Sequence, residues 1–308
     1  MKALPDTDAP AFTRREFVRT SLLAVSGAAL GLKAAEPGSP GAPRPVIGFS
    51  KPFQSMGPED MAQFVGEVGW SGIECPVRPQ GQIEPERVGE QLPRLVEAFR
   101  RRDLEIPIVV TEITSMRDAH AEEVLRVAAK LGTRKFRLGT FKYTEDRSIA
   151  KQLDGFGNDL REIGEVCGQL GIEAAVQNHS GVDRFGAPVW DLVGVLRDFH
   201  VKNVGIFFDI AHATVEGGMS WPIQARLAEP FYIAIYVKDF VWLKEAGGWR
   251  PEWCPLGEGM VDRSFISGLK RTGYSGILCQ HMEYPMRNRA DMLAHMRKDL
   301  KVLREWFS

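Results

Sequence analysis

Apolar and polar positions follow two alternating periods along most of this chain. Short, nearly continuous apolar runs are typical of strands buried on both faces of a parallel sheet. Between them, apolar residues recur every three or four positions, as from Ile149 to Leu170, which predicts amphipathic helices. The runs expected to form strands are 46–50, 72–75, 106–110, 134–138, 172–177, 204–209, 232–238 and 276–281. Eight consecutive βα units predict an α/β fold, a single (β/α)8 TIM barrel.

The competing architecture is an open, doubly wound sheet. No G-x-G-x-x-G motif opens the first predicted helix, and Pro52 follows the first strand instead. The chain has 308 residues and 44% hydrophobic content, enough for a barrel that commonly takes about 250 residues. We therefore expect one barrel domain over residues 46–308, preceded by a separate segment, residues 1–45.

The first 45 residues have a different character. Arg14 and Arg15 are followed by Phe17 and Val18, then by an uncharged apolar run over 20–32 and a Pro/Gly-rich stretch to Pro45. This order resembles a twin-arginine export signal followed by a linker, which implies a periplasmic or otherwise exported protein. Thirteen apolar residues are too few to cross about 30 Å of hydrocarbon, so no transmembrane span is expected after processing.

Charge and cysteine content narrow the range of partners. The net charge is −1, from 39 basic and 40 acidic residues mixed along the chain, which provides no broad cationic surface for nucleic acid or an anionic membrane. The four cysteines, at 75, 167, 254 and 279, lack metal-binding spacing and are expected to be free thiols. A small-molecule carbohydrate is the expected partner, and the oligomeric state is left open.

Four consecutive predicted strands end in groups capable of acid–base or metal chemistry. Gln177 and His179 end one strand, Asp209 and His212 the next, Lys238 the next, and His281 and Glu283 the last. Because side chains alternate with period two, Gln177 and His179 share one face, as do Tyr236 and Lys238, and His281 and Glu283. The carboxyl ends of barrel strands meet at one rim, where barrel enzymes place their active sites, so the chain is expected to be an enzyme.

These residues also carry a family resemblance. F-D-I-A-H at 208–212, V-K-D at 237–239 and G-Y-S-G at 273–276 resemble motifs of the xylose isomerase-like barrels, a sugar phosphate isomerase/epimerase group, over about residues 46–305. The resemblance implies a divalent metal (Mn²⁺, Mg²⁺ or Zn²⁺) held by a Glu, an Asp, a His and a Glu at the ends of strands five to eight. It assigns Asp209 to the metal and His212 to the substrate.

Three positions depart from the family pattern. Gln177 and His281 stand where the two Glu ligands belong, and Tyr236 stands where the His belongs. A carbonyl oxygen from Gln177 and an imidazole from His281 are still acceptable donors, and His179 and Glu283 lie one pleat further along the same faces. The expected metal ligands are Asp209, Gln177, His179 and His281.

The reaction that such sites share is removal of a proton from the carbon next to a carbonyl. A metal that binds the carbonyl oxygen stabilises the enediolate as it forms. His281, Glu283 and His212 are the expected catalytic residues, because His titrates near neutral pH and a buried Glu can have a raised pKa. The predicted activity is metal-assisted proton abstraction on a sugar or keto-sugar, of the isomerase or epimerase type.

The segment after the seventh strand favours a sugar. Trp242, Trp249 and Trp253 lie close together there, and aromatic faces stack on the apolar faces of sugar rings. Glu258 in a G-E-G turn and Lys238 are further expected substrate contacts. Glu74 and Arg137 are weaker candidates, expected to form salt bridges at the rim.

Three alternatives remain open from the sequence. A β-eliminating lyase acting on a keto-sugar or glycoside would use the same enediolate, and a noncatalytic exported sugar-binding barrel would explain the replaced ligands. The endonuclease IV branch of the same barrels needs a zinc centre rich in His and Glu, and the six histidines supply too few at strand ends.

Overall fold

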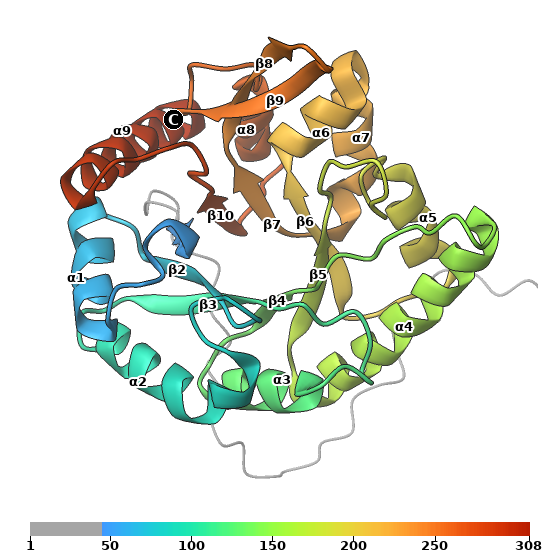
Figure 1. The fold of residues 1–308 in the computed structure, drawn as a ribbon, viewed down its shortest axis with the longest axis horizontal. Helices are drawn as coiled ribbons and strands as arrows, with labels where there is room; N and C mark the ends of the chain where they lie inside the picture. Colours follow the sequence, from blue (N-terminus) through green and yellow to red (C-terminus); the bar gives the residue numbers. More distant parts are fainter. Residues whose placement is uncertain (1–44) are drawn as a thin grey trace, which may run out of the picture. The chain divides into compact units, whose positions relative to one another are not determined.

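The computed structural model describes residues 45–308, and the expected export signal lies outside this range. Eight parallel strands close into a barrel in the order β1-β10-β7-β6-β5-β4-β3-β2, with helices around the outside (Figure 1). The barrel strands are β1 (Val46–Phe49), β2 (Gly72–Pro76), β3 (Glu105–Val110), β4 (Lys135–Arg137), β5 (Glu173–Gln177), β6 (Val204–Asp209), β7 (Tyr232–Val237) and β10 (Ile277–Gln280). The predicted (β/α)8 barrel is confirmed, and each strand lies within a residue or two of its expected position.

The helices alternate with the strands along the chain. They are α1 (Pro58–Val68), α2 (Val88–Arg100), α3 (Ala121–Lys130), α4 (Ile149–Leu170), α5 (Trp190–Asp198), α6 (Ile210–Gly217), α7 (Trp221–Ala228), α8 (Ser264–Arg271) and α9 (Arg289–Phe307). Short 3-10 segments cover Lys51–Phe53, Pro85–Arg87, Gly218–Ser220 and Glu229–Phe231. Among residues 45–308, no helix is long and apolar enough to cross a membrane.

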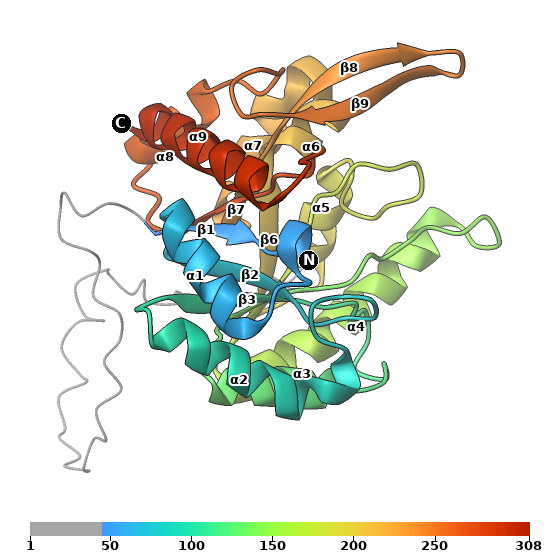
Figure 2. The ribbon, with the colours of Figure 1, turned by 60° about the vertical axis from the view of Figure 1, so that its left-hand side comes forward.

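One element was not expected from the sequence. The segment after β7 forms an antiparallel hairpin, β8 (Asp239–Glu245) and β9 (Gly248–Cys254), in which Phe240 pairs with Trp253. Figure 2 shows this hairpin projecting beyond the barrel. The sequence predicts a tryptophan-rich loop here, although residues 240–243 form a continuous apolar run that is compatible with a strand.

Two apolar layers build the barrel. The larger layer packs the outward faces of the strands against the helices, whereas a small inner cluster fills the barrel itself. The inner cluster consists of Ile47, Ile108, Ala175, Phe207, Ala234, Tyr236 and Cys279. Two residues further along four of these strands stand Gln177, Asp209, Lys238 and His281. The alternation that buries the inner cluster therefore directs polar side chains toward the carboxyl-end rim.

The described cysteines are all free, as expected. Cys75, Cys167 and Cys279 are buried and Cys254 is partly buried.

Candidate active site

Asp209 lies at the centre of the rim and is completely buried. It precedes α6 as its N-cap residue, and its Oδ1 atom accepts hydrogen bonds from the backbone N–H groups of Ala211 and His212. Two unpaired N–H groups at the start of a helix stabilise a carboxylate placed there. Asn178, also fully buried, exchanges two hydrogen bonds with the Asp209 backbone, at 2.7 and 3.0 Å. Hydrogen bonds from the start of α6 and from Asn178, which follows β5, thus fix the position of Asp209.

The ammonium group of Lys238 lies between two carboxylates. Its Nζ atom is 2.8 Å from Glu283 Oε1 and 3.4 Å from Asp209 Oδ2, and it stands 4.2 Å from the centre of the Trp253 ring. The lysine side chain is only 2% exposed. The two carboxylates and the aromatic face replace the water that burial removes from this ammonium group.

Gln177 connects Asp209 to a buried arginine. Its amide nitrogen donates to Asp209 Oδ2 at 2.9 Å, while its carbonyl oxygen accepts from Arg137 Nη1 at 2.9 Å. The oxygen expected to bind a metal therefore faces the guanidinium. The Arg137 guanidinium also covers the ring of Phe49, 5.3 Å from its centre.

A second buried network joins β2, β7 and β10. Glu74 accepts a hydrogen bond from the Tyr236 hydroxyl and is bonded to His281 Nε2 at 2.8 Å. Burial alone would raise the pKa of Glu74, but the charges of His281 and Arg137 hold it below its ordinary value. Burial would likewise lower the pKa of His281, and Glu74 raises it above the ordinary value. Glu74 and His281 are therefore a charged pair, and the salt bridge expected of Glu74 is made with His281, both residues being buried.

Glu283 links this pair to Lys238. His281 Nδ1 lies 3.6 Å from Glu283 Oε1, the same oxygen that binds Lys238. Burial would raise the pKa of Glu283, but Lys238 and His281 together hold it well below its ordinary value. The raised pKa considered for this residue from the sequence is therefore wrong, and Glu283 is a carboxylate at neutral pH.

The two histidines on the other side of Lys238 are neutral. Burial, followed by the charge of Lys238, lowers the pKa of His179 to about 4 and that of His212 well below its ordinary value. The two rings are 3.9 Å apart, and His212 Nδ1 bonds to Ser180 Oγ at 2.8 Å. His179 Nδ1 faces the carbonyl oxygen of Ser180 at 2.9 Å, so it carries the proton and leaves Nε2 as an acceptor.

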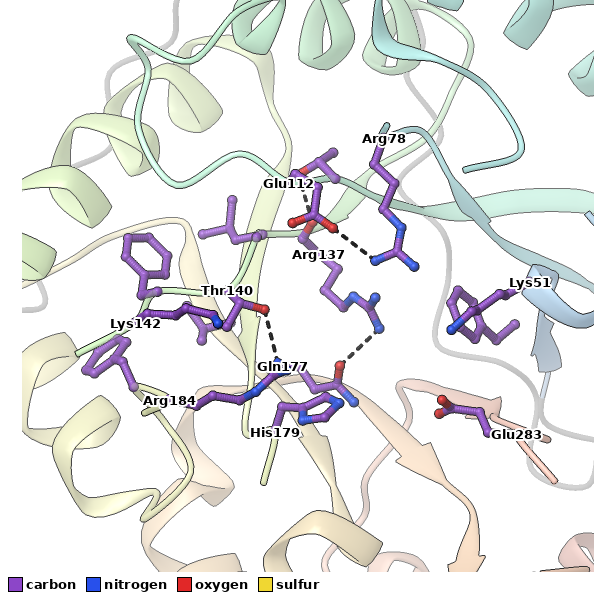
Figure 3. Close-up of a pocket in the computed structure, with 17 residues that line it drawn as sticks. Lys51, Arg78, Glu112, Arg137, Thr140, Lys142, Gln177, His179, Arg184 and Glu283 are labelled. Carbon is purple, nitrogen blue, oxygen red and sulfur yellow. Dashed lines mark hydrogen bonds and ion pairs between the residues drawn. The ribbon is translucent and has the colours of Figure 1, made fainter. Parts of the chain in front are cut away.

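A pocket of about 410 Å³ opens above these networks (Figure 3). Glu283, Gln177 and His179 line it, together with Arg137 and residues of the loops that follow β1 to β5. The other two expected catalytic residues do not line it: His212 is completely buried, and His281 is 2% exposed. Of the expected catalytic residues, only Glu283 can touch a molecule in this pocket.

The expected carbohydrate contacts after β7 are dispersed. Trp242 and Trp249 lie on the projecting hairpin, 40% and 64% exposed, and neither lines the pocket. Glu258 forms an ion pair with Lys298 of α9 and is also absent from the pocket wall. Trp253 packs inward, with its ring edge against His212. Its ring also covers the Lys238 ammonium, 4.2 Å from the ring centre.

The expected metal ligands do not form one ligand set. Lys238 Nζ already occupies the space between Asp209 and Glu283, and a divalent ion bonded to these oxygens at about 2.0 to 2.6 Å would collide with that ammonium group. The carbonyl oxygen of Gln177 is engaged by Arg137. The residues around Asp209 therefore do not fit the metal that the resemblance implied.

A different group has the composition of a metal site. Glu74, Cys279 and His281 each offer one ligand atom, all within 4.8 Å of one another, and all three residues are buried. Carboxylate, thiolate and imidazole are donors that Zn²⁺ accepts. Both Glu74 oxygens are already bonded, however, and burial raises the pKa of Cys279 well above its ordinary value. This group could hold an ion, but only by breaking the Glu74–His281 bond.

The closed barrel and its polar carboxyl-end rim define a (β/α)8 protein of the kind that acts on small molecules. Residues 62–306 match the xylose isomerase-like TIM barrel family, and the chain belongs to it. Two uncharacterized proteins are similar in sequence: YihM of Escherichia coli, 22% identical over 66% of this chain, and MJ1311 of Methanocaldococcus jannaschii, 28% identical over 42%. The matches span 59% and 43% of those proteins.

Solved structures share the fold. The 3-keto-D-glucoside 4-epimerase YcjR of E. coli is 14% identical, with a TM-score of 0.67 over 85% of this chain and all of that chain. A probable 3-DHS dehydratase, AsbF of Bacillus anthracis, is 18% identical, with a TM-score of 0.65 over 84% and 98%. A Mycobacterium smegmatis protein in complex with magnesium is 14% identical, with a TM-score of 0.64 over 86% and 98%. At these identities, the likeness concerns the fold.

Proposed function

We propose that this protein is an enzyme that removes a proton from the carbon next to the carbonyl group of a sugar or keto-sugar and returns it in an isomerase or epimerase reaction. One observation carries the proposal. Glu283 lines the pocket while two buried cations, Lys238 and His281, hold it in its charged form; the other carboxylate of the wall, Glu112, is paired with Arg78. The sugar epimerases that share the fold support the same class of reaction.

Glu283 is the base in this proposal. It is the one expected acid–base group that is both charged and in the pocket wall, with 24% of its side chain exposed. A carboxylate with a low pKa is a weak base, so most of the rate must come from stabilising the product of proton removal. The protein therefore needs cations close to the developing enediolate oxygen.

The fixed cations of the site supply that stabilisation. The Arg137 guanidinium lines the pocket, and the Lys238 ammonium lies directly behind Glu283. Both are held by hydrogen bonds or ion pairs before any substrate arrives, and little reorganisation accompanies the charge that develops. The positive charge of the guanidinium near the developing enediolate oxygen lowers the pKa of the carbon acid.

His281 and Glu74 position the base. The His281 ring is stacked between Phe49 and Tyr236, with ring centres 4.6 and 4.3 Å away, and Glu74 holds its other nitrogen. The imidazole thus keeps Nδ1 directed at Glu283, and the proton that Glu283 takes from carbon returns to carbon from the same carboxyl group.

Solvent exchange in D₂O tests the proposal. We expect candidate keto-sugars and sugars to lose a proton signal next to the carbonyl, followed by NMR, without any requirement for added Mn²⁺ or Mg²⁺. Glu283→Gln should lower the exchange rate by roughly 10²- to 10⁴-fold, since a positioned base contributes that much, while ligand affinity changes little. Glu258→Gln, which alters an exposed carboxylate outside the pocket, is the matched control.

The products separate the remaining alternatives. An unsaturated product would identify the lyase reaction, which begins with the same proton removal. Saturable binding with no exchange in the wild-type protein would contradict the enzymatic proposal and leave a noncatalytic sugar-binding barrel.

Export by the twin-arginine route also remains a proposal, resting on Arg14 and Arg15. Fractionation of cells that produce the wild-type chain and an Arg14→Lys/Arg15→Lys variant tests it. Equal distribution of the two between periplasm and cytoplasm would contradict it.

A further inference from the structure

The pocket wall carries an excess of positive charge. Five cationic side chains line it, namely Lys51, Arg78, Arg137, Lys142 and Arg184, but only two acidic ones, Glu112 and Glu283. The net charge of the whole chain is −1, so this imbalance is local. Basic and acidic residues are mixed along the sequence, so this local excess of positive charge could not be recognised from the sequence.

Existing ion pairs do not remove the imbalance. Glu112 binds Arg78 at 3.2 Å, and Glu283 is bound to Lys238, which lies outside the pocket wall. Lys142 pairs with Asp183. Within residues 45–308, no carboxylate lies within 4 Å of Lys51, Arg137 or Arg184 in an ion pair. Three cations around the pocket are therefore left without a counter-charge in contact.

Arg137 is the most informative of the three. It is partly buried at the base of the pocket, and the only hydrogen bond of its guanidinium within the described chain is the one to Gln177. Glu74 is the carboxylate that raises the pKa of Arg137 most, and it is already bonded to His281. A guanidinium has five N–H donors in a rigid plane, which matches two oxygens of a carboxylate or phosphate. Most of these donors are available to a ligand.

Arg78 and Lys51 share the same space. Figure 3 shows the Arg78 and Arg137 guanidinium groups and the Lys51 amine directed into the pocket on one side, with Glu283 and His179 on another. The Arg78 side chain is 20% exposed and uses one terminal nitrogen for Glu112. A ligand whose anionic group lay among these three cations would present its remaining atoms to Glu283.

We infer that the substrate is an anionic carbohydrate, a sugar acid or a sugar phosphate, whose oxyanion binds Lys51, Arg78 and Arg137. This inference deepens the proposed function, on which it rests for the carbohydrate nature of the substrate. The oxygens of a neutral sugar accept hydrogen bonds from the guanidinium but bring no negative charge to replace the water removed from it, which is unfavourable. An oxyanion forms charge-assisted hydrogen bonds there instead.

Binding measurements distinguish the sources of the anion. Calorimetric titration of the full chain would compare glucuronate, glucose 6-phosphate and glucose at two salt concentrations. We expect the acid or the phosphate to bind at least tenfold more tightly than glucose, with affinity that falls as salt rises. Preference for glucuronate identifies a carboxylate site, and preference for glucose 6-phosphate identifies a phosphate site.

Charge-removing variants complete the test. Arg78→Gln and Lys51→Gln should each weaken binding of the preferred anion by roughly 10- to 100-fold, the usual effect of losing a charge-assisted contact. Arg126→Gln removes the same charge from the outer helix α3, where Arg126 pairs with Glu122, and should change the affinity less than twofold.

Glucose binding as tightly as its charged relatives would overturn the inference, as would equal weakening by all three variants, or no binding of either anion at millimolar concentration. These outcomes are independent of proton exchange. An anion that binds without exchange contradicts the proposed function alone, whereas exchange on neutral sugars without anion preference contradicts the inference alone.

Discussion

Lys238 determines what the centre of the rim can bind. Its ammonium lies within ion-pair distance of both Asp209 and Glu283 and against the Trp253 ring. From the sequence, a divalent cation is expected beside Asp209. The structure fills that position with a cation belonging to the chain, which also explains how Gln177 can direct its amide nitrogen rather than an oxygen at Asp209.

Replacing this lysine tests its role as the resident cation. In Lys238→Met, two buried carboxylates lose their partner, so we expect the free energy of unfolding to fall by about 3 to 5 kcal/mol and solvent exchange to be lost. The variant should also bind Mn²⁺ more tightly than the wild type, because the carboxylates become available as ligands. Electron paramagnetic resonance measures the bound Mn²⁺, and thermal unfolding with and without Mn²⁺ measures the stability that it restores.

Lys298→Met provides the comparison, since Lys298 makes only an exposed ion pair with Glu258. Wild-type protein that binds Mn²⁺ as tightly as Lys238→Met would show that the ammonium does not exclude a metal from the site.

Residue parity along the strands could be predicted, but the partners of each residue could not. Period-two alternation correctly placed Gln177 and His281 toward the barrel mouth. Alternation gave no reason to place Glu74 and Arg137 at the centre of the site, because the bond between Glu74 and His281 joins positions 207 residues apart. A single signal was available: each is a charged residue within or beside an apolar strand, where an unpaired charge is costly.

At the scale of elements, Asp239 holds the segment that follows the hairpin. Its carboxylate accepts backbone hydrogen bonds from Phe240, Gly257, Gly259 and Val261. Asp239 is 1% exposed, and these four N–H donors satisfy a charge that would otherwise be unfavourable to bury. The V-K-D motif therefore supplies one residue to the active site and one to the architecture above it.

Gly259 must lack a side chain for this arrangement. A Cβ atom at position 259 would lie 2.3 Å from Asp239 Oδ1 and 2.4 Å from the Phe240 carbonyl oxygen. Gly259→Ala should therefore lower the free energy of unfolding by about 2 to 3 kcal/mol, in the range of other changes that force a shift in buried structure. Urea unfolding measures it.

Gly247 lies at the tip of the same hairpin, and a Cβ there would have no atom within 4 Å. Gly247→Ala should leave stability within about 0.5 kcal/mol of the wild type. Similar losses from both substitutions would show that the crowding around Asp239 does not matter.

At the scale of the whole barrel, α9 is fastened to the end of β10 by a buried carboxyl group. Tyr284 donates a hydrogen bond to Asp299 Oδ2 at 2.8 Å, and Asp299 is 2% exposed. Burial raises the pKa of Asp299 to about 6. The folded protein therefore binds a proton more tightly than the unfolded chain, in which the pKa of an Asp is ordinarily 3.8.

Stability should depend on pH through this group. Because the folded-state pKa is raised, the contribution of Asp299 is most favourable when it is protonated and declines as pH rises from about 4 to above 6. The shift of about two pKa units corresponds to roughly 3 kcal/mol. Asp299→Asn removes the titration, so we expect the variant to gain stability relative to the wild type at pH 8 and much less at pH 5, measured by urea unfolding.

Glu305→Gln on the exposed side of α9 gives the control, because the Glu305 side chain is 62% exposed and pairs with Lys301 one helical turn away. A stability difference for Asp299→Asn that is the same at both pH values would rule out Asp299 as the titrating group.

The sequence by itself determined the barrel and the direction of its functional face. Eight apolar runs separated by amphipathic helices specify a (β/α)8 fold. A continuous apolar run buries both faces of a strand, whereas apolar residues every three or four positions bury one face of a helix. Alternation within each run then fixed which side chains point into the mouth. These properties are local, and they depend on neighbours a few residues apart.

Tertiary structure decided which charges meet. Closing the barrel pairs β1 with β10, and only then do Glu74, Tyr236 and His281 form one network. Lys238 comes to lie between Asp209 and Glu283 in the same folded arrangement. The excess of cations in the pocket arises in the same way, since it collects side chains from separate loops. Electrostatic energy depends on distances in space and on exclusion of water, and neither is encoded in the local order of residues.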